Sequence, residues 1–407
     1  MIKKIIKNLK ISSTLRINEV SKELEKKGEK IFKFGFGQSP FEIPENIVSE
    51  LKNNANKNKY LPMQGLYDLR SEIAKYSNKI KNYNYKSENI FIGPGSKELM
   101  FLLNLAFDGE IILPTPSWVS YEPQGILGNN KIHKIETSAE KNWFPSAKSI
   151  ESIVLKNKNI NYLLFINSPN NPSGQICQNL EEIANTVNKY NITVLSDEIY
   201  SELSFSNEYK SIANFCPERT IVSNGLSKWC AAGGWRLGYF VIPNELKNLG
   251  ESLKVLASET FSAVSAPIQY AAIGAFKNNH HDYLNKSRNI LKMVGEYVYK
   301  NLKSNKVLIN KPQGGFYLMP EFLEKKFSSS EVMCNDLLKK KGVAILPGSD
   351  FGFNKDKLIA RLSFTDFDGK AFMKNYNINS SNEDLLSEYA PNIIEGTKRL
   401  KDWAESN

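Results

Sequence analysis

The middle of the chain alternates short runs of apolar, β-branched residues with amphipathic segments, and this alternation restricts the possible folds more than any other feature. The apolar runs are continuous, which is typical of strands buried on both faces of a parallel sheet. The pattern predicts two helices, at 96–107 and 180–190, and strands at 89–93, 110–114, 161–167, 192–196, 220–223 and 238–242. We therefore predict an α/β fold with a mostly parallel central sheet and helices on both faces.

The two ends of the chain carry a different pattern, so we expect more than one domain in 407 residues. Helical periodicity or strand-like runs mark residues 15–27, 283–302, 315–318 and 359–364. Asparagine and serine are dense in residues 369–382, which favours a polar loop. We predict an N-terminal arm that also belongs to the small domain, a large domain, and a smaller α+β domain, at residues 1–45, 46–294 and 295–407.

The composition argues against several classes of function. The net charge is +10, but lysine and arginine are scattered, whereas a nucleic-acid surface needs them clustered, so we expect no nucleic-acid partner. No run of about 18 apolar residues occurs, so we expect no membrane span. The basic segment Met1–Lys7 lacks the apolar core of a signal peptide, which favours a cytoplasmic protein.

Histidine and cysteine are too sparse and too dispersed to predict a metal centre. His133, His280 and His281 lie in no motif, and no two of the four cysteines have CxxC spacing. We therefore expect no bound metal, and free thiols in a reducing compartment. A proton-transferring enzyme would need another base, and a lysine with a lowered pKa is the obvious candidate.

Lys228 is the residue of this chain best suited to carry chemistry. It lies among small residues after the β-branched run Thr220–Val222, and Arg236 follows it in the same segment. A lysine amine can form a Schiff base with an aldehyde cofactor, and an arginine can bind the phosphate of that cofactor. A surface lysine in a glycine-rich loop is the simpler alternative, so the other motifs of the chain have to discriminate between them.

Two turns that follow predicted strands carry groups able to bind a ligand. Gly95, Ser96 and Lys97 join a strand to a helix, where glycine allows close backbone approach and helical N–H groups can bind a phosphate. An ordinary glycine turn with a serine cap would have the same sequence. Asn171 lies in the turn 168–174, where its amide could bind a ligand oxygen, although prolines and asparagines also favour a plain tight turn.

Four more residues complete the candidates, each with a structural alternative. Asp197 follows a predicted strand, and a carboxylate beside a pyridine nitrogen keeps that nitrogen protonated; Tyr200 is close enough to share its face. Trp118 would either stack on a flat cofactor or belong to the core. Arg361 lies in an apolar strand-like run and would bind either a substrate carboxylate or a structural ion-pair partner.

The order of these motifs resembles the fold type I enzymes that use pyridoxal 5′-phosphate (PLP), and more narrowly the class I/II aminotransferases, the family of aspartate aminotransferase. The resemblance extends from about residue 12 to about residue 365, and its strongest pieces are residues 170–174, 196–200, 227–228 and 234–238, with 60–70 as a further match. It implies the PLP-dependent transferase fold, PLP bound in the large domain, and transfer of an α-amino group from an amino acid to a 2-oxo acid such as 2-oxoglutarate.

The resemblance also implies a role for each candidate. Lys228 would form the Schiff base and carry the proton, with Asp197 and Tyr200 completing the catalytic set. The residues implied to hold PLP are Gly95, Ser96, Lys97, Trp118, Asn171, Asp197, Tyr200, Ser227, Lys228, Arg236 and Tyr60. The substrate would be bound by Gly37, Trp118, Asn171 and Arg361, with the arginine on its α-carboxylate.

Tyr60 is similar to a family tyrosine that reaches the phosphate in a neighbouring subunit, so the resemblance implies a homodimer with shared active sites.

Two positions depart from the family pattern. Gly225 replaces a serine that binds phosphate in many relatives, which leaves Ser227 or backbone groups for that task, and Gln38 stands where many relatives have glutamate. The donor therefore stays open among aspartate-like, aromatic and other amino acids, and a PLP-dependent C–S β-lyase or another reaction of this fold stays an alternative.

Overall fold

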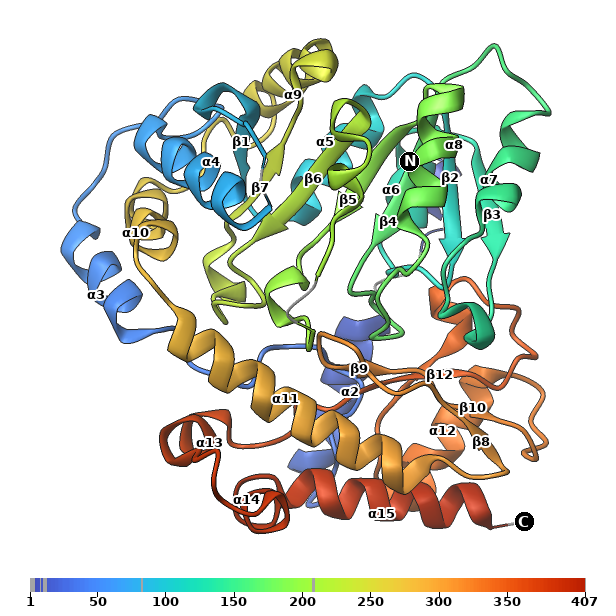
Figure 1. The fold of residues 1–407 in the computed structure, drawn as a ribbon. Helices are drawn as coiled ribbons and strands as arrows, with labels where there is room; N and C mark the ends of the chain where they lie inside the picture. Colours follow the sequence, from blue (N-terminus) through green and yellow to red (C-terminus); the bar gives the residue numbers. More distant parts are fainter. Residues whose placement is uncertain (1–3, 8, 10–12, 82, 207–208, 407) are drawn as a thin grey trace.

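The computed structural model describes residues 4–7, 9, 13–81, 83–206 and 209–406, and its centre is a seven-stranded sheet (Figure 1). The strand order is β1-β7-β6-β5-β4-β2-β3. β7 is antiparallel to both of its neighbours, and every other pair in this sheet is parallel. The strands are β1 Ile90–Gly93, β2 Glu110–Thr115, β3 Ile132–Glu136, β4 Tyr162–Asn167, β5 Thr193–Asp197, β6 Thr220–Gly225 and β7 Gly238–Val241.

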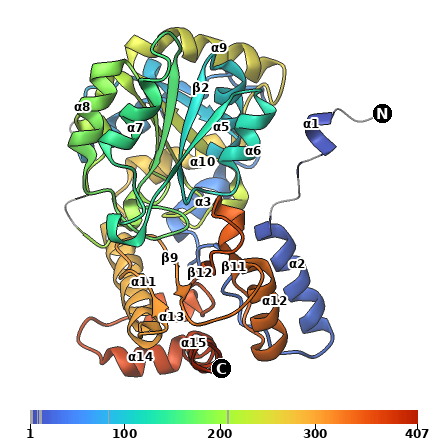
Figure 2. The ribbon, with the colours of Figure 1, turned by 90° about the vertical axis from the view of Figure 1, so that its right-hand side faces the viewer.

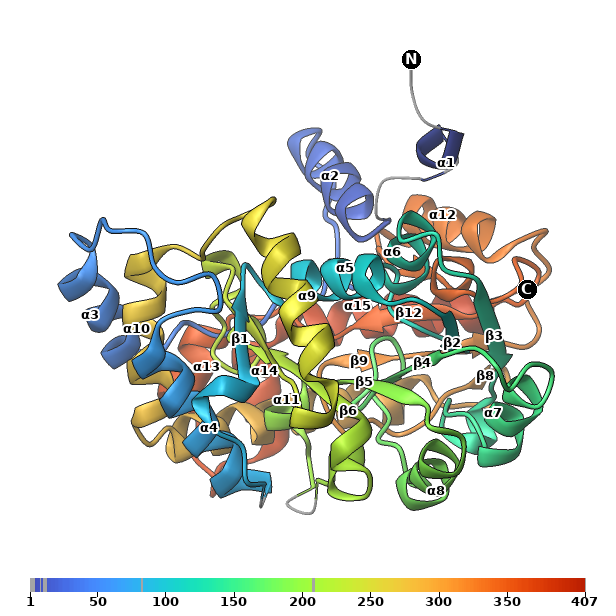
Figure 3. The ribbon, with the colours of Figure 1, turned by 90° about the horizontal axis from the view of Figure 1, so that it is seen from above.

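Helices cover both faces of this sheet, which confirms the predicted α/β architecture (Figures 2 and 3). Side chains of β4 alternate between two cores, because Leu163 and Phe165 pack with α5 and α9 whereas Leu164 and Ile166 pack with α7 and α8. Burial on both faces explains why the strands are continuously apolar. The helices of this part are α3 Glu45–Asn54, α4 Tyr67–Lys81, α5 Ser96–Ala106, α6 Tyr121–Leu127, α7 Ala147–Val154, α8 Leu180–Tyr190, α9 Lys247–Ser258 and α10 Ala266–Lys277.

Whereas α1 lies beside α6 in Figure 2, the helix α2 and the C-terminal part of the chain lie together beneath this sheet in Figure 1. A three-stranded antiparallel sheet, in the order β11-β12-β9, lies among helices there, so the α+β character predicted for the C-terminal region is confirmed. Its strands and a second pair are β8 Val307–Leu308, β9 Tyr317–Leu318, β10 Glu321–Phe322, β11 Leu346–Pro347 and β12 Ala360–Ser363. The helices of this lower part are α2 Ser13–Lys26, α11 His281–Leu302, α12 Ser330–Lys341, α13 Gly369–Asn375, α14 Asn382–Tyr389 and α15 Pro391–Glu405, and the short helix α1 is Lys4–Lys7.

The polar loop predicted at residues 369–382 is wrong at both of its ends. Residues 369–375 form α13, and α14 begins at Asn382. The carboxylate of Asp368 accepts a hydrogen bond from the backbone N–H of Ala371 at 2.9 Å and caps α13, while Phe372 is fully buried beneath it. One cap and one buried aromatic side chain thus outweigh the polar composition.

The long helix α11 passes across the boundary predicted between residues 294 and 295, and the division into domains stays a prediction. The start of the predicted arm, residues 1–3, lies outside the described residues, as do parts of residues 8–12. All four cysteines are free and buried: Cys177, Cys216, Cys230 and Cys334. Within the described ranges, no helix is both long and apolar enough to cross a membrane.

Candidate active site

A cavity of about 420 Å³ opens at the carboxyl ends of β4 and β5, where parallel sheets commonly collect ligand-binding groups. Asn167 ends β4 and Asp197 ends β5, and both line the cavity. The structure brings most of the predicted site residues to this one place. Those that line the cavity are Gly37, Ser96, Lys97, Trp118, Asn171, Asp197, Tyr200, Ser227, Lys228, Arg236 and Arg361.

Lys228 follows β6 in a turn, and its Nζ donates a hydrogen bond to the backbone oxygen of Gly37 at 2.9 Å. The ammonium also lies 5.7 Å from the ring centroid of Tyr200 and 5.5 Å from that of Phe316. Burial lowers the pKa of Lys228, and the charges of Arg361 and Arg236 add to this lowering, while Tyr317 and Asp197 oppose it. A lysine in this setting can release its proton readily, which a nucleophile or a general base requires.

Asp197 is the carboxylate of this cavity, and both of its oxygens accept hydrogen bonds. The hydroxyl of Tyr121 donates to Oδ2 at 2.6 Å, and the backbone N–H of Ile199 donates to Oδ1 at 3.3 Å. Burial raises the pKa of Asp197 to about 6, while these two hydrogen bonds and the charge of Lys228 oppose that shift. A buried carboxylate of this kind fits a cationic partner such as a protonated ring nitrogen.

The N-terminus of α5 and Arg236 form the end of the cavity suited to a phosphate. Gly95 adopts φ +86° before the helix, and a side chain there would collide with the guanidinium of Arg236. Lys97 lies close to this arginine, so burial and then the charge of Arg236 lower the pKa of Lys97. Two cations and the first N–H groups of a helix favour a bound anion.

Gly225, where a phosphate-binding serine is expected from the family, ends β6 with the backbone of another strand close by. A Cβ atom at this position would lie 2.7 Å from the backbone oxygen of Leu237. The close approach explains the glycine. Ser227, two residues further on, lines the cavity instead.

Arg361, on β12, also lines the cavity and is almost fully buried. Its Nη1 donates to Oδ1 of Asn171 at 3.1 Å and its Nη2 to the backbone oxygen of Gly35 at 2.6 Å. The guanidinium lies 4.6 Å from the ring centroid of Tyr317, and its Nε is buried without a hydrogen-bond partner among the described residues. A buried cation with an unused donor fits a ligand carboxylate.

Hydroxyl and amide groups connect this arginine to the middle of the cavity. The hydroxyl groups of Tyr200 and Tyr317 lie 3.1 Å apart, and Nδ2 of Asn171 donates to the Tyr200 oxygen at 3.5 Å. Gly37 leaves room for Tyr317, because a side chain at residue 37 would collide with the tyrosine hydroxyl. The position therefore requires glycine as long as Tyr317 occupies this place.

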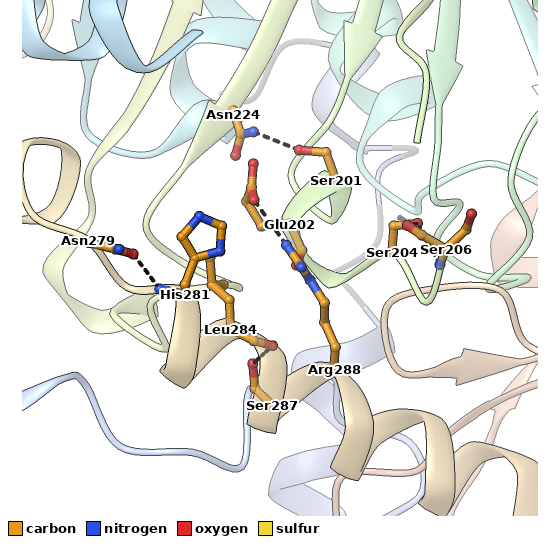
Figure 4. Close-up of polar contacts among 10 residues, drawn as sticks. All are labelled: Ser201, Glu202, Ser204, Ser206, Asn224, Asn279, His281, Leu284, Ser287 and Arg288. Carbon is orange, nitrogen blue, oxygen red and sulfur yellow. Dashed lines mark hydrogen bonds and ion pairs between the residues drawn. The ribbon is translucent and has the colours of Figure 1, made fainter. Parts of the chain in front are cut away.

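The turn that follows Tyr200, η3 Ser201–Leu203, is tied to two other elements (Figure 4). Arg288 of α11 donates from Nε to the backbone oxygen of Glu202 at 2.6 Å, and its Nη2 lies 3.4 Å from the Glu202 carboxylate. Nδ2 of Asn224, on β6, donates to the hydroxyl of Ser201 at 3.2 Å. The backbone that carries Tyr200 is thereby fixed to both the sheet and the long helix.

Two predicted site residues do not line the cavity. Gly95 lies behind the guanidinium of Arg236, and Tyr60 is 97% exposed outside the cavity. Sequence reasoning also missed Tyr121, which does not line the cavity but hydrogen-bonds to Asp197, 76 positions away, so that no local spacing signalled its role. The cavity-lining residues that it missed are Phe36, Gln38, Val119, Ser120, Asn167, Ile199, Gly233, Gly234 and Tyr317.

These groups fit PLP: an anion site at the α5 N-terminus, a buried carboxylate for a ring nitrogen, a lysine in the same cavity and a separate arginine for a substrate carboxylate. In the described part of the chain, no group of three or more His, Cys, Asp or Glu residues could hold a metal ion. Fold and cavity together define a PLP-dependent enzyme of fold type I.

Comparisons with known proteins narrow this class. The family model for aminotransferase class I and II matches residues 29–367. The chain is 33% identical to an aspartate aminotransferase of Bacillus sp. (strain YM-2) over 364 residues, covering 85% of this chain and 91% of that protein. It is 30% identical over 358 residues to an asparagine–oxo-acid transaminase of Streptococcus mutans, covering 84% and 89%. The crystal structure of aspartate aminotransferase from Thermotoga maritima superposes with a TM-score of 0.83 at 28% identity, covering 100% of both chains.

The chain belongs to the class I and II aminotransferase family. It is a PLP-dependent aminotransferase, an enzyme that moves an amino group between an amino acid and a 2-oxo acid. The predicted fold, cofactor and enzyme class are confirmed. The relatives named above are transaminases, so the comparisons support transamination over the C–S β-lyase alternative.

Proposed function

We propose that Lys228, Asp197 and Arg361 carry the transamination of an α-amino acid. PLP, when bound, supplies an aldehyde and an electron-withdrawing ring. Lys228 Nζ binds it and moves the α-proton, Asp197 holds the ring nitrogen, and Arg361 binds the substrate α-carboxylate. The observation that carries this proposal is the single cavity that these three side chains share, with one anion and several cations on its wall.

The remaining cavity groups fix the orientation of cofactor and substrate. Ser96, Lys97, Ser227 and Arg236, with the backbone at Gly95, bind the phosphate. Tyr200 and Asn171 bind the phenolic oxygen of the ring, supported by their hydrogen bond to each other. Trp118 stacks on the ring and borders the substrate, and the backbone of Gly37 assists Arg361. Fixed donors of this kind hold reacting atoms in line and so lower the entropic part of the barrier.

The amino donor we propose is aspartate or asparagine, with a 2-oxo acid such as 2-oxoglutarate as acceptor. The names of the two relatives above support this choice, because both denote four-carbon donors. Gln38 lines the cavity beside Gly37 and offers an uncharged amide to a substrate side chain. The chain is proposed to act in the cytoplasm, as expected for amino-acid metabolism.

An amino-donor screen tests this proposal. Wild-type protein with PLP and 2-oxoglutarate is assayed with aspartate, asparagine, alanine and phenylalanine, and kcat/KM is compared. We expect the four-carbon donors to lead, and the variant Lys228→Ala to lose at least about 10²-fold in turnover, the low end for a removed general base. Lys277→Ala, an exposed lysine on α10, serves as the control. A tenfold preference for alanine or phenylalanine would contradict the donor, and full activity of Lys228→Ala would contradict the mechanism.

A further inference from the structure

Tyr121 has a buried polar group that the roles assigned so far do not use. It is the first residue of α6, its side chain is 3% exposed, and its hydroxyl hydrogen-bonds to Oδ2 of Asp197 at 2.6 Å. The two residues are 76 positions apart in the chain. A hydroxyl at this distance from a carboxylate forms a charge-assisted hydrogen bond, about twice as strong as a neutral one.

The aromatic ring of Tyr121 is itself fixed by its neighbours. It packs edge-on against Trp118, with 5.4 Å between ring centroids and 78° between ring planes. On another side it packs against Phe165 of β4 at 5.0 Å. The hydroxyl therefore has little freedom to leave Asp197, and the same ring contacts the tryptophan proposed to stack on PLP.

Among the described residues, each carboxylate oxygen of Asp197 has one hydrogen-bond donor, so the plane of the carboxylate is set from two sides. Ile199 N–H lies on Oδ1 at the longer distance of 3.3 Å, and Tyr121 provides the shorter bond on Oδ2. We infer that Tyr121 is a positioning residue, which keeps the Asp197 carboxylate ionised and aimed at the ring nitrogen of PLP. This inference rests on the proposed role of Asp197.

The electrostatics of the site point the same way. Burial raises the pKa of Asp197 towards neutrality, and the Tyr121 hydrogen bond is the largest effect opposing it. The other titratable groups that act on this carboxylate, or on which it acts, are Tyr200, Tyr209 and Lys228. Without the Tyr121 hydroxyl, Asp197 would be protonated over more of the neutral range and would bind a cationic ring nitrogen less well.

The test uses full-length protein stripped of PLP and titrated with PLP. We expect Tyr121→Phe to weaken PLP binding about 10- to 100-fold, the range for losing a hydrogen bond to a charged group, and to shift the pH midpoint of the visible absorption band. Tyr162→Phe is the matched control, because the hydroxyl of this buried residue of β4 donates to the backbone oxygen of Asn157 at 3.0 Å, away from the cavity. The control should leave both readouts at the wild-type values.

The variant Asp197→Asn separates the two proposals. If Tyr121 acts through Asp197, adding Tyr121→Phe to Asp197→Asn changes PLP affinity by less than about twofold, since coupled residues are not additive. A strong effect of Asp197→Asn together with a Tyr121→Phe variant that matches the Tyr162→Phe control overturns the inference alone. An Asp197→Asn variant with wild-type affinity and spectrum overturns the role of Asp197 and the inference with it.

Discussion

At the scale of single residues, the ionisation of Asp197 ties the site to the stability of the protein without PLP. Its pKa is raised to about 6 in the folded state from 3.8, so its contribution to stability is fully present below about pH 4 and is lost as pH rises through about 6. This difference in pKa of about 2 between the folded and the unfolded state corresponds to about 3 kcal/mol. In urea unfolding of PLP-free protein, we expect the free energy of unfolding of the wild type to fall by up to this amount, relative to that of Asp197→Asn, between about pH 4 and 7. A difference that stays constant over this range would contradict the raised pKa.

The residues found from the sequence and those missed differ in how local their signals are. Asp197, Asn171 and Lys228 each follow a strand in a recognisable local motif, and the cavity contains all three. Tyr121 and Tyr317 act through hydroxyl groups that meet partners 76 and 117 positions away. Such pairs depend on how α6 and β9 pack, and no local spacing in the chain encodes them.

At the scale of elements, the contact between α11 and the turn after Tyr200 is a specific source of stability. Arg288 satisfies both the backbone oxygen and the largely buried carboxylate of Glu202. Arg288→Met should therefore lower the free energy of unfolding by about 2 kcal/mol, because a buried charge loses its partner. Urea unfolding of the PLP-bound protein measures this. Lys254→Met, which breaks an exposed pair with Glu251, should cost less than about 0.5 kcal/mol. If both variants lost the same free energy of unfolding, the contact between α11 and Glu202 would stabilise the protein no more than an exposed ion pair does.

The elements that could be predicted are those in which successive residues have the same degree of burial. Buried strands such as β4 and β5 are continuously apolar, and their predicted bounds agree with the structure to within a residue. The edge strand β3 was missed because its sequence, Ile132–Glu136, is half polar, as suits a strand with only one neighbour. Helix α13 was missed for a similar reason, because its buried aromatic residue, Phe372, lies in an otherwise polar segment.

At the scale of the whole molecule, Tyr60 suggests how two chains could share a site. Its side chain is 97% exposed, and Met63 and Tyr67 nearby are 40% and 60% exposed, an unusual density of uncovered apolar surface. We propose a homodimer in which Tyr60 binds the PLP phosphate of its partner. Sedimentation should show a dimer, and Tyr60→Phe should weaken PLP binding about tenfold while the dimer persists. Tyr299→Phe, on α11, is the control. A fully active monomer would contradict the proposal.

The four buried thiols are natural probes of local unfolding in this protein. Cys177 and Cys216 lie in one core beside α8, Cys230 lies two residues after Lys228, and Cys334 lies in α12. Burial raises the pKa of all four thiols, so alkylating reagents meet neither an accessible sulfur nor a thiolate in the native fold. The rate at which each cysteine is alkylated therefore reports how often its own neighbourhood unfolds. Mass spectrometry of one timed reaction would rank the sheet, the lysine turn and the C-terminal helices by local stability, with no label introduced.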